Sequence, residues 1–309
     1  MKPPFYNQFW HDSGVCWGTI LLTAGLTLAS PHLLAVSPEE IAQNPPSPES
    51  SSLENSVLQI ARQITVRILT DPGAGSGVII DRRGDIYTVL TCDHVANGGR
   101  DETYEILTPD GQTHVGWRRQ ISVLQGLDLA VIEFESHNPY RVAILGNLEQ
   151  ISVGEPIYVS GFPNYQPRDD NGLDITYDWG LEAFRFSAGN VSMKLSERSL
   201  QRGYQLAYTN ENGVGMSGGP VLDRYGQVIG IHGRGRVTIQ GIETFRFTDG
   251  TLPSRELYER MSPLSWAIPI STFQRLIEPS QTPLPCRNDP SPSPPPAKPV
   301  RPNERPETI

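Results

Sequence analysis

Three short segments of the chain carry the side chains that acyl transfer requires. His94 follows an apolar run, Asp128 stands between two leucines, and Ser217 lies in a glycine-rich segment. A serine hydroxyl becomes a nucleophile at neutral pH only when an imidazole accepts its proton. A carboxylate must in turn orient that imidazole and stabilise its charge. Each segment supplies one of these groups, so the sequence predicts a catalytic triad.

The serine segment, Gly215 to Val221, also predicts where a developing negative charge is stabilised. Glycine allows unusual backbone angles and a close approach of substrate, and the segment reads Gly-Met-Ser-Gly-Gly-Pro-Val. We expect the backbone N–H groups of Gly215 and Ser217 to converge as an oxyanion hole. Asp128, with leucine on both sides, is expected to be buried, and a buried acid needs a partner. His94 is the natural one, whereas Asp93 beside it is expected to have a surface role.

The elements that must position these residues are predicted to be short strands. The chain contains 29 glycines and 28 prolines among many short apolar runs, which favours an all-β fold over a helical one. One helix is predicted, at Pro269–Ile277, with Pro279 as its stop. Strands are predicted at Ile64–Leu69, Gly77–Ile80, Ile86–Leu90, Tyr104–Thr108, Leu129–Phe134, Ile157–Ser160, Arg185–Met193, Gln205–Tyr208, Val221–Leu222 and Val228–Ile231.

In this order, the three segments resemble the trypsin/chymotrypsin superfamily. The chain is most similar to its bacterial members, the glutamyl endopeptidases and the high-temperature-requirement (HtrA-type) proteases. Further similarity lies in the runs GSGVII, SGFP and QVIGIH. The resemblance covers roughly residues 60–278. It implies two six-stranded antiparallel β-barrels with the active site between them. The first barrel would carry His94 and Asp128, and the second would carry Ser217.

Two residues near Ser217 give opposite indications about the substrate. Glu211 occupies the place that forms the pocket floor in trypsin-like enzymes, where an acid selects lysine or arginine. His232 matches a histidine that contacts an acidic substrate side chain in glutamyl endopeptidases. A positively polarised imidazole would pair with a carboxylate, and Arg234 and Arg236 add positive charge. We therefore expect acidic substrates, with a solvent-facing Glu211 loop as the alternative.

The resemblance has two departures. Met216 stands where digestive enzymes have the aspartate that activates a zymogen through a new N-terminus, so that activation route is not expected. No PDZ domain is expected after the protease-like segment, unlike the full HtrA-type architecture. Because a lone histidine, a Leu-Asp-Leu run or a glycine-rich serine loop is often only structural, a catalytically inactive peptide-binding module stays an alternative. An oligomeric quality-control protease is another.

Charge and cysteine content limit the partners. The formal net charge of −9 argues against nucleic acid, because phosphate binding needs clustered lysine and arginine. Cys16, Cys92 and Cys286 show neither metal-binding spacing nor a disulfide framework. We therefore expect no metal or cofactor, and a peptide or protein as the substrate. Cys92 is predicted to be a core residue, and a Cys92–Cys286 bridge after export is the alternative.

The chain is expected to have four parts. Residues 1–36 contain an apolar stretch interrupted by Pro31 and His32 and predict a signal peptide or a retained N-terminal anchor. Residues 37–55 are predicted to be a flexible Pro/Ser/Glu-rich spacer, 56–278 the protease domain, and 279–309 a proline-rich disordered tail. The protein is therefore expected to be exported, with membrane contact only through the anchor. The oligomeric state is left open.

Overall fold

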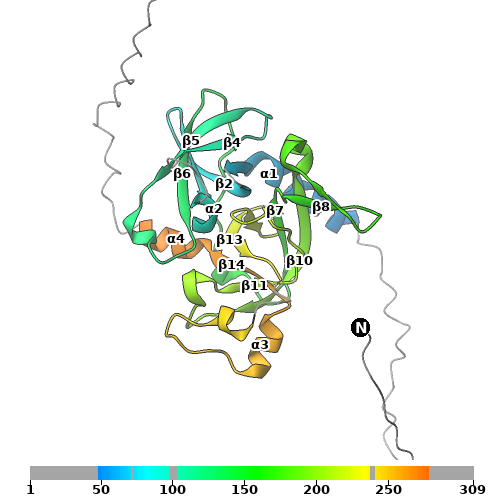
Figure 1. The fold of residues 1–309 in the computed structure, drawn as a ribbon, viewed down its shortest axis with the longest axis vertical. Helices are drawn as coiled ribbons and strands as arrows, with labels where there is room; N and C mark the ends of the chain where they lie inside the picture. Colours follow the sequence, from blue (N-terminus) through cyan, green and yellow to red (C-terminus); the bar gives the residue numbers. More distant parts are fainter. Residues whose placement is uncertain (1–47, 71–72, 98–102, 237–240, 278–309) are drawn as a thin grey trace, which may run out of the picture. The chain divides into compact units, whose positions relative to one another are not determined.

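Two closed barrels, each of six antiparallel strands, form the body of the part of the chain that the structure describes (Figure 1). The structure is a computed structural model that describes residues 48–70, 73–97, 103–236 and 241–277. The fold predicted from the sequence, an all-β protein with two six-stranded antiparallel barrels and a C-terminal helix, is confirmed. The predicted signal or anchor segment and the predicted tail lie outside the described residues.

The first barrel is formed in the order β1-β2-β3-β6-β5-β4. Its interior is lined by alternate side chains of each strand, because successive residues of a strand point to opposite faces. The strands are β1 Thr65–Thr70, β2 Gly73–Arg83, β3 Ile86–Thr91, β4 Thr103–Leu107, β5 Thr113–Arg119 and β6 Ala130–Glu135.

The second barrel is formed in the order β10-β11-β14-β13-β12-β7. A separate two-stranded hairpin, β8 Tyr165–Pro167 and β9 Leu173–Ile175, follows β7 and projects from the body (Figure 1). The barrel strands are β7 Pro156–Gly161, β10 Arg185–Lys194, β11 Leu206–Tyr208, β12 Pro220–Leu222, β13 Val228–Arg234 and β14 Ser265–Pro269.

Helices occupy the two ends of the folded part and a few connections. The helix α4, Ile270–Ile277, confirms the predicted C-terminal helix to within one residue. The other helices are α1 Pro48–Ile64, α2 Asp93–Ala96 and α3 Arg255–Met261, and the 3-10 turns are η3 Ser122–Leu124, η4 Leu148–Gln150, η5 Tyr177–Ala183, η6 Gln201–Gly203 and η7 Ile242–Phe245.

Helix α1 shortens the spacer expected at 37–55, because residues 48–55 are helical. Val57, Ala61 and Ile64 stand at helical spacing and are almost completely buried. Their side chains form one face that packs on strands β2, β7 and β12. Residues 52–56, which precede Val57 in the helix, are exposed. The serine and glutamate in this part of the chain favour a spacer when the sequence is considered alone.

Several elements were not predicted from the sequence. Strand β5 has Gly116 between Val115 and Trp117 and polar residues at both ends, and β14 ends in a proline, so neither has the clear apolar alternation of the other strands. Helix α3 is short and begins at the Ser254 cap, whose side chain accepts a hydrogen bond from the Leu257 N–H. These elements depend on tertiary partners more than on local pattern.

The register of two strand pairs determines where the candidate site forms. In the antiparallel pair β3/β6, Thr91 at the end of β3 lies opposite Ala130 at the start of β6. The residues after β3 and those before β6 are therefore neighbours. In the second barrel, Pro220 of β12 lies opposite Ile231 of β13. That register places the glycine-rich segment before β12 beside the end of β13.

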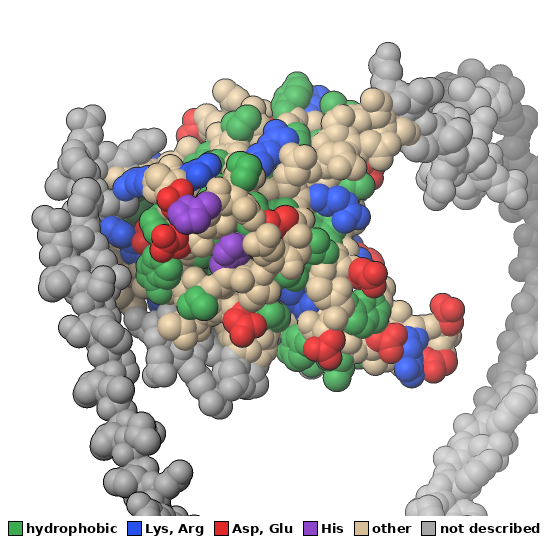
Figure 2. Space-filling model, turned by 90° about the horizontal axis from the view of Figure 1, so that it is seen from above, with side chains coloured by type: hydrophobic (Ala, Val, Ile, Leu, Met, Phe, Trp, Pro, Cys, Tyr) green, Lys and Arg blue, Asp and Glu red, His purple; other side chains and the backbone are tan. Residues whose placement is uncertain are grey.

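One face of the molecule carries mixed charge. Figure 2 shows a face on which acidic and basic side chains are interspersed among apolar and uncharged ones. This pattern accords with the net charge of −9 and differs from the clustered lysine and arginine that bind a phosphate backbone. Within the described ranges, the helices are all too short or too polar to span a bilayer.

Phe134 provides a test of the first barrel. Its ring is fully buried, stacks on Tyr87 with 5.3 Å between centroids and also contacts His114. Phe134→Ala is expected to lower the free energy of unfolding by about 3–5 kcal/mol, because it removes a buried ring and leaves a cavity. Denaturant unfolding measures this. The control Val115→Ala, at a side chain that is 69% exposed, should change stability by less than about 0.5 kcal/mol.

Candidate active site

His94 and Asp128 meet because the end of β3 lies beside the start of β6. His94 lies in α2, directly after β3, and Asp128 lies two residues before the first residue of β6. The imidazole Nδ1 is 2.7 Å from Asp128 Oδ2, and the His94 backbone N–H donates to Oδ1 over 3.0 Å. The imidazole is 38% exposed, whereas the Asp128 side chain is 2% exposed. The histidine is thus held from behind by a buried acid and faces solvent on its other side.

The second barrel completes the surroundings of Asp128. The Tyr204 hydroxyl donates to Oδ2, the same oxygen that His94 contacts. The guanidinium of Arg202 lies 2.9 Å from Oδ1. The Asp128 backbone N–H also donates to the Arg202 carbonyl over 2.9 Å. Donors from both barrels therefore fix one carboxylate.

These donors keep Asp128 ionised. Burial alone would raise the pKa of the Asp128 carboxyl, but hydrogen bonds and charge from His94, together with the Tyr204 hydrogen bond, lower that pKa below its ordinary value. An ionised carboxylate can only accept hydrogen bonds. The contact with Nδ1 therefore fixes the tautomer in which His94 carries its proton on Nδ1 and leaves Nε2 able to accept one.

The Ser217 loop is anchored on the first barrel. Ser76 of β2 is completely buried, and its backbone N–H donates to the Ser217 carbonyl over 2.8 Å. The Ser76 hydroxyl donates to the Gly215 carbonyl over 2.9 Å. At Gly218, where φ is +88°, an added Cβ would lie 2.0 Å from the Ser76 carbonyl oxygen. Only glycine permits this approach, so the loop and β2 are fitted to each other.

The Ser217 hydroxyl is close to the end of β13. Its Oγ lies 3.5 Å from the Gly233 carbonyl oxygen. Among the described residues, no hydrogen bond joins Ser217 to His94. Both side chains nevertheless line one cavity of about 510 Å³, so they share a space that a peptide bond can enter.

The peptide bond between Val214 and Gly215 has a fixed orientation. Gly215 adopts φ +100°, and the Val214 carbonyl accepts a hydrogen bond from the Asn164 N–H over 2.6 Å. Because a trans peptide points its N–H opposite to its carbonyl, the Gly215 N–H faces away from Asn164. In the part of the chain that the structure describes, neither this N–H nor that of Ser217 has a hydrogen-bond partner. Both remain available as donors.

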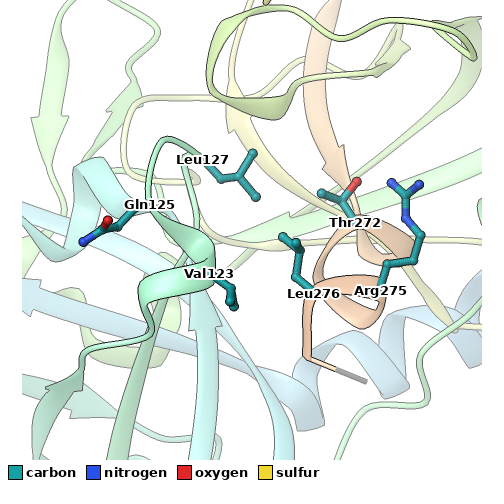
Figure 3. Close-up of a pocket in the computed structure, with 6 residues that line it drawn as sticks. All are labelled: Val123, Gln125, Leu127, Thr272, Arg275 and Leu276. Carbon is teal, nitrogen blue, oxygen red and sulfur yellow. The ribbon is translucent and has the colours of Figure 1, made fainter. Parts of the chain in front are cut away.

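The cavity shared by His94 and Ser217 lies between the barrels. Its lining is rich in glycine and arginine: His94, Asp128, Arg202, Tyr204, Asn212, Gly213, Val214, Ser217, His232, Gly233, Arg234, Gly235 and Arg236. A second pocket of about 480 Å³ lies between the η3 segment and α4 (Figure 3). Its lining of Val123, Gln125, Leu127, Thr272, Arg275 and Leu276 offers no acid–base pair.

His232 lies in the wall of the active cavity as an uncharged imidazole. It is 1% exposed, and its Nδ1 is 2.7 Å from the Tyr208 hydroxyl. Burial first, and then the charge of His94, lower the pKa of His232 to about 3. Among the described residues, its Nε2 has no hydrogen-bond partner. The expected imidazolium is therefore not what this wall presents at neutral pH.

The arginines near His232 differ in their partners. Glu211 is exposed, forms an ion pair of 2.9 Å with Arg236 and is not part of the cavity wall. Arg234 packs on the rings of Tyr204 and Phe245 and donates to the Thr244 carbonyl. Burial lowers the pKa of Arg234, and the charges of Tyr204 and Asp128 oppose this. Arg234 lacks a carboxylate partner at ion-pair distance among the described residues.

Cys92 lies behind the His94–Asp128 pair. Its Sγ and the nearest ligand atoms of His94 and Asp128 lie within 4.8 Å of one another. Burial, followed by the charge of Asp128, raises the pKa of the thiol, and the thiol donates to the His232 carbonyl over 3.2 Å. Metals bind the thiolate, so a packing role fits this residue better. Cys286, the alternative disulfide partner, lies outside the described residues.

Some residues of the site were not predicted from the sequence. Tyr204, Arg202, Ser76 and Asn164 stand outside the three motifs, and only Ser76 fell within a run that carried the resemblance. Asp93, expected at the surface, forms ion pairs with Arg118 over 2.6 Å and with Arg202 over 2.8 Å. Arg202 adopts φ +67°, but this unusual backbone angle is visible only in the folded chain and could not be predicted from the sequence.

Two barrels with a His–Asp pair on one and a serine loop on the other define the chymotrypsin-like class of fold. The sequence matches the family described as "Trypsin-like peptidase domain" over residues 75–231. This segment makes up more than half of the chain, and the chain belongs to the trypsin-like peptidase family.

Curated relatives point to HtrA-type protease domains within that family. The chain is 28% identical to "Serine protease Do-like HtrB" of Bacillus subtilis over 189 residues, which are 59% of this chain and 36% of that protein. It is 28% identical to "Putative serine protease HhoB" of Synechocystis over 210 residues, covering 67% of this chain and 40% of that protein. For "Putative serine protease HhoA" of Synechocystis, identity is 30% over 171 residues, with 55% and 39% covered. The chain thus spans about two fifths of these relatives.

The buried His232 predicts acid sensitivity. Its pKa of about 3 in the folded state lies below the ordinary 6.5, so the unfolded state binds the extra proton between these values. The His232 contribution to stability is complete above pH 6.5 and is lost as pH falls toward 3, with a slope of about 1.4 kcal/mol per pH unit. Denaturant unfolding from pH 3 to 8 measures it. His232→Asn should show a shallower slope by about this amount, and equal slopes would contradict the prediction.

Proposed function

We propose that the chain is a serine endopeptidase that cuts peptide bonds with His94, Asp128 and Ser217. The observation that carries the proposal is the 2.7 Å contact between His94 Nδ1 and the buried Asp128 carboxylate, in a cavity that Ser217 also lines. This pairing leaves Nε2 free to accept a proton beside a hydroxyl nucleophile. Membership of the trypsin-like peptidase family supports the same chemistry.

The proposed reaction begins with Ser217. Rotation about its Cα–Cβ bond turns Oγ from the Gly233 carbonyl toward His94, which removes the proton as Oγ attacks the scissile carbonyl carbon. Asp128 holds the imidazole and stabilises the imidazolium. His94 then donates the proton to the leaving amine, and water hydrolyses the acyl-enzyme with His94 as base again.

The negative oxygen of the tetrahedral intermediate is proposed to lie between the N–H groups of Gly215 and Ser217. Neither group has another partner among the described residues, and the Asn164 contact fixes the Val214–Gly215 peptide. Preorganised donors of this kind cost no reorganisation during the reaction. Loss of one such donor generally slows an enzyme by about 10²–10³-fold.

We propose that the specificity pocket favours an acidic side chain, with His232 as a neutral donor. If Tyr208 donates to Nδ1, His232 carries its proton on Nε2, which can donate to a substrate carboxylate. The positive charge comes from Arg234, which lacks a carboxylate partner at ion-pair distance among the described residues, and from Arg236. Glu211 partly neutralises Arg236 from outside the cavity wall and weakens the preference without reversing it.

The remaining assignments are also proposals. Peptides or proteins are the proposed partners, and residues 1–36 are proposed to export the chain or anchor it at its N-terminus. Residues 56–278 are the proposed protease domain, to which α1 adds residues 48–55. The proline-rich segment 279–309 is proposed to be a disordered tail.

Ser217→Ala tests the reaction. The variant is expected to lose on the order of 10⁶ in kcat, because the nucleophile is removed and triad residues act as a unit. Hydrolysis of a quenched fluorescent peptide measures the loss. Ser271→Ala, at a partly buried serine of α4 that is not among the residues lining the cavity shared by His94 and Ser217, is the matched control and should keep its rate. Full activity in Ser217→Ala would show that the nucleophile is wrongly assigned.

A fluorophosphonate probe separates the enzyme from an inactive peptide-binding module. Wild-type protein should be labelled at Ser217, and heating or Ser217→Ala should abolish labelling, because the probe reacts only with an activated hydroxyl. A folded wild-type protein that binds peptides without being labelled would favour the binding module.

Cleavage of a peptide series that differs only at the residue before the scissile bond tests the pocket. Glutamate is expected to exceed lysine in kcat/KM by about tenfold or more, since 1.4 kcal/mol corresponds to a factor of ten. Glu211→Gln should raise this ratio and Arg236→Gln should lower it, because each removes one charge of the same ion pair. Preferred cleavage after lysine or arginine would overturn the assignment.

A further inference from the structure

The strongest unassigned feature is a tyrosine hydroxyl that is hydrogen-bonded to the carboxylate of the proposed triad. Tyr204 is 2% exposed, and its hydroxyl donates to Asp128 Oδ2, the oxygen that also contacts His94 Nδ1 at 2.7 Å. The other oxygen, Oδ1, takes the His94 backbone N–H at 3.0 Å and Arg202 at 2.9 Å. Tyr204 therefore shares the one carboxylate oxygen that governs the imidazole.

The Tyr204 hydroxyl occupies space that a side chain at Gly233 would otherwise fill. A Cβ added to Gly233 would lie 2.4 Å from the Tyr204 hydroxyl oxygen and 2.9 Å from Cys92 Sγ. The Gly233 backbone does not have the positive φ that favours glycine. The absence of a side chain at this position is thus explained by the place that the tyrosine hydroxyl occupies. On its ring, Tyr204 also carries the Arg234 guanidinium, 4.9 Å from the ring centroid.

We propose that Tyr204 is a positioning residue of the active site that ties the acid of the first barrel to the second barrel, which carries Ser217, and sets the charge that Asp128 presents to His94. Tyr204 precedes β11 of the second barrel, whereas Asp128 precedes β6 of the first. Its hydroxyl fixes Oδ2 relative to the barrel of the nucleophile. It also withdraws charge from Oδ2, because a carboxylate oxygen that accepts two hydrogen bonds attracts each proton less.

The hydroxyl remains a donor throughout the working pH range. Burial first, and then the charges of Cys92 and Asp128, raise the pKa of Tyr204 well above its ordinary value. The ionisable groups around the His94–Asp128 pair come from several elements and belong to the same environment: Cys92, Asp93, Arg202, Tyr204, His232 and Arg234. Tyr204→Phe removes only the hydroxyl oxygen of Tyr204 and leaves the other five groups in the sequence unchanged.

Titration of the His94 imidazole by NMR in the full-length chain tests the proposal without relying on activity. In Tyr204→Phe, Oδ2 regains negative charge and stabilises the protonated imidazole, so the midpoint should rise by about 0.5–1 pH unit. The His94 resonance is identified by its loss in His94→Ala. Tyr87→Phe is the matched control, since it removes a buried hydroxyl that donates to Asn138 over 2.7 Å, remote from the triad. Its midpoint should not move.

A second test, by enzyme kinetics, rests on the proposed peptidase activity. Tyr204→Phe should lower kcat/KM by about 10–100-fold, mainly through kcat, and move the acidic limb of its pH profile in the same direction as the NMR midpoint. Gly233→Ala keeps the hydroxyl but displaces it, and should shift the midpoint in the same direction, which serves if Tyr204→Phe does not fold. An unmoved His94 midpoint in a folded variant overturns the role of Tyr204. If Tyr204→Phe shifts the His94 midpoint but the wild-type protein hydrolyses no peptide, only the proposed function is contradicted.

Discussion

The structure of the site depends on one buried carboxylate. Asp128 is 2% exposed, and an unpaired charge in such a place would cost several kcal/mol. It stays ionised because His94, Arg202 and Tyr204 replace the water it loses. Two of these side chains come from the second barrel. The requirement to satisfy one charge therefore joins the barrels at the point where the imidazole must be oriented.

A second set of contacts joins the barrels at Ser217. Ser76 of the first barrel binds the carbonyl groups of Gly215 and Ser217 in the second, while Tyr204 of the second binds the acid of the first. The contacts are therefore reciprocal: the first barrel binds the Ser217 loop of the second, and the second barrel binds Asp128 of the first. A displacement of one barrel would break both sets of hydrogen bonds together, so the site is assembled cooperatively with the interface.

The sequence predicted the parts of this arrangement that are local. The fold class followed from short strands and turn residues. The His, Asp and Ser segments could be recognised because each candidate side chain lies within a characteristic local motif. The residues that hold these segments could not be predicted in the same way. Tyr204 and Arg202 act across the interface, 76 and 74 positions from Asp128, and nothing in their neighbours distinguishes them from ordinary surface or core residues. Strands β5 and β14 were missed for a similar reason, because pairing partners rather than alternation define them.

His232 shows how packing changes the chemistry that a motif suggests. Its position in the sequence favours a charged partner for an acidic substrate, but burial and the charge of His94 keep its imidazole neutral. Two imidazolium groups lining one cavity would repel each other, and the protonated form of His94 is the one the proposed reaction requires. Desolvation of His232 against Tyr208 therefore leaves the positive charge to His94 at the moment it holds the serine proton. In the proposed reaction, the same neutral imidazole would donate a hydrogen bond to a substrate carboxylate without competing with His94 for the serine proton.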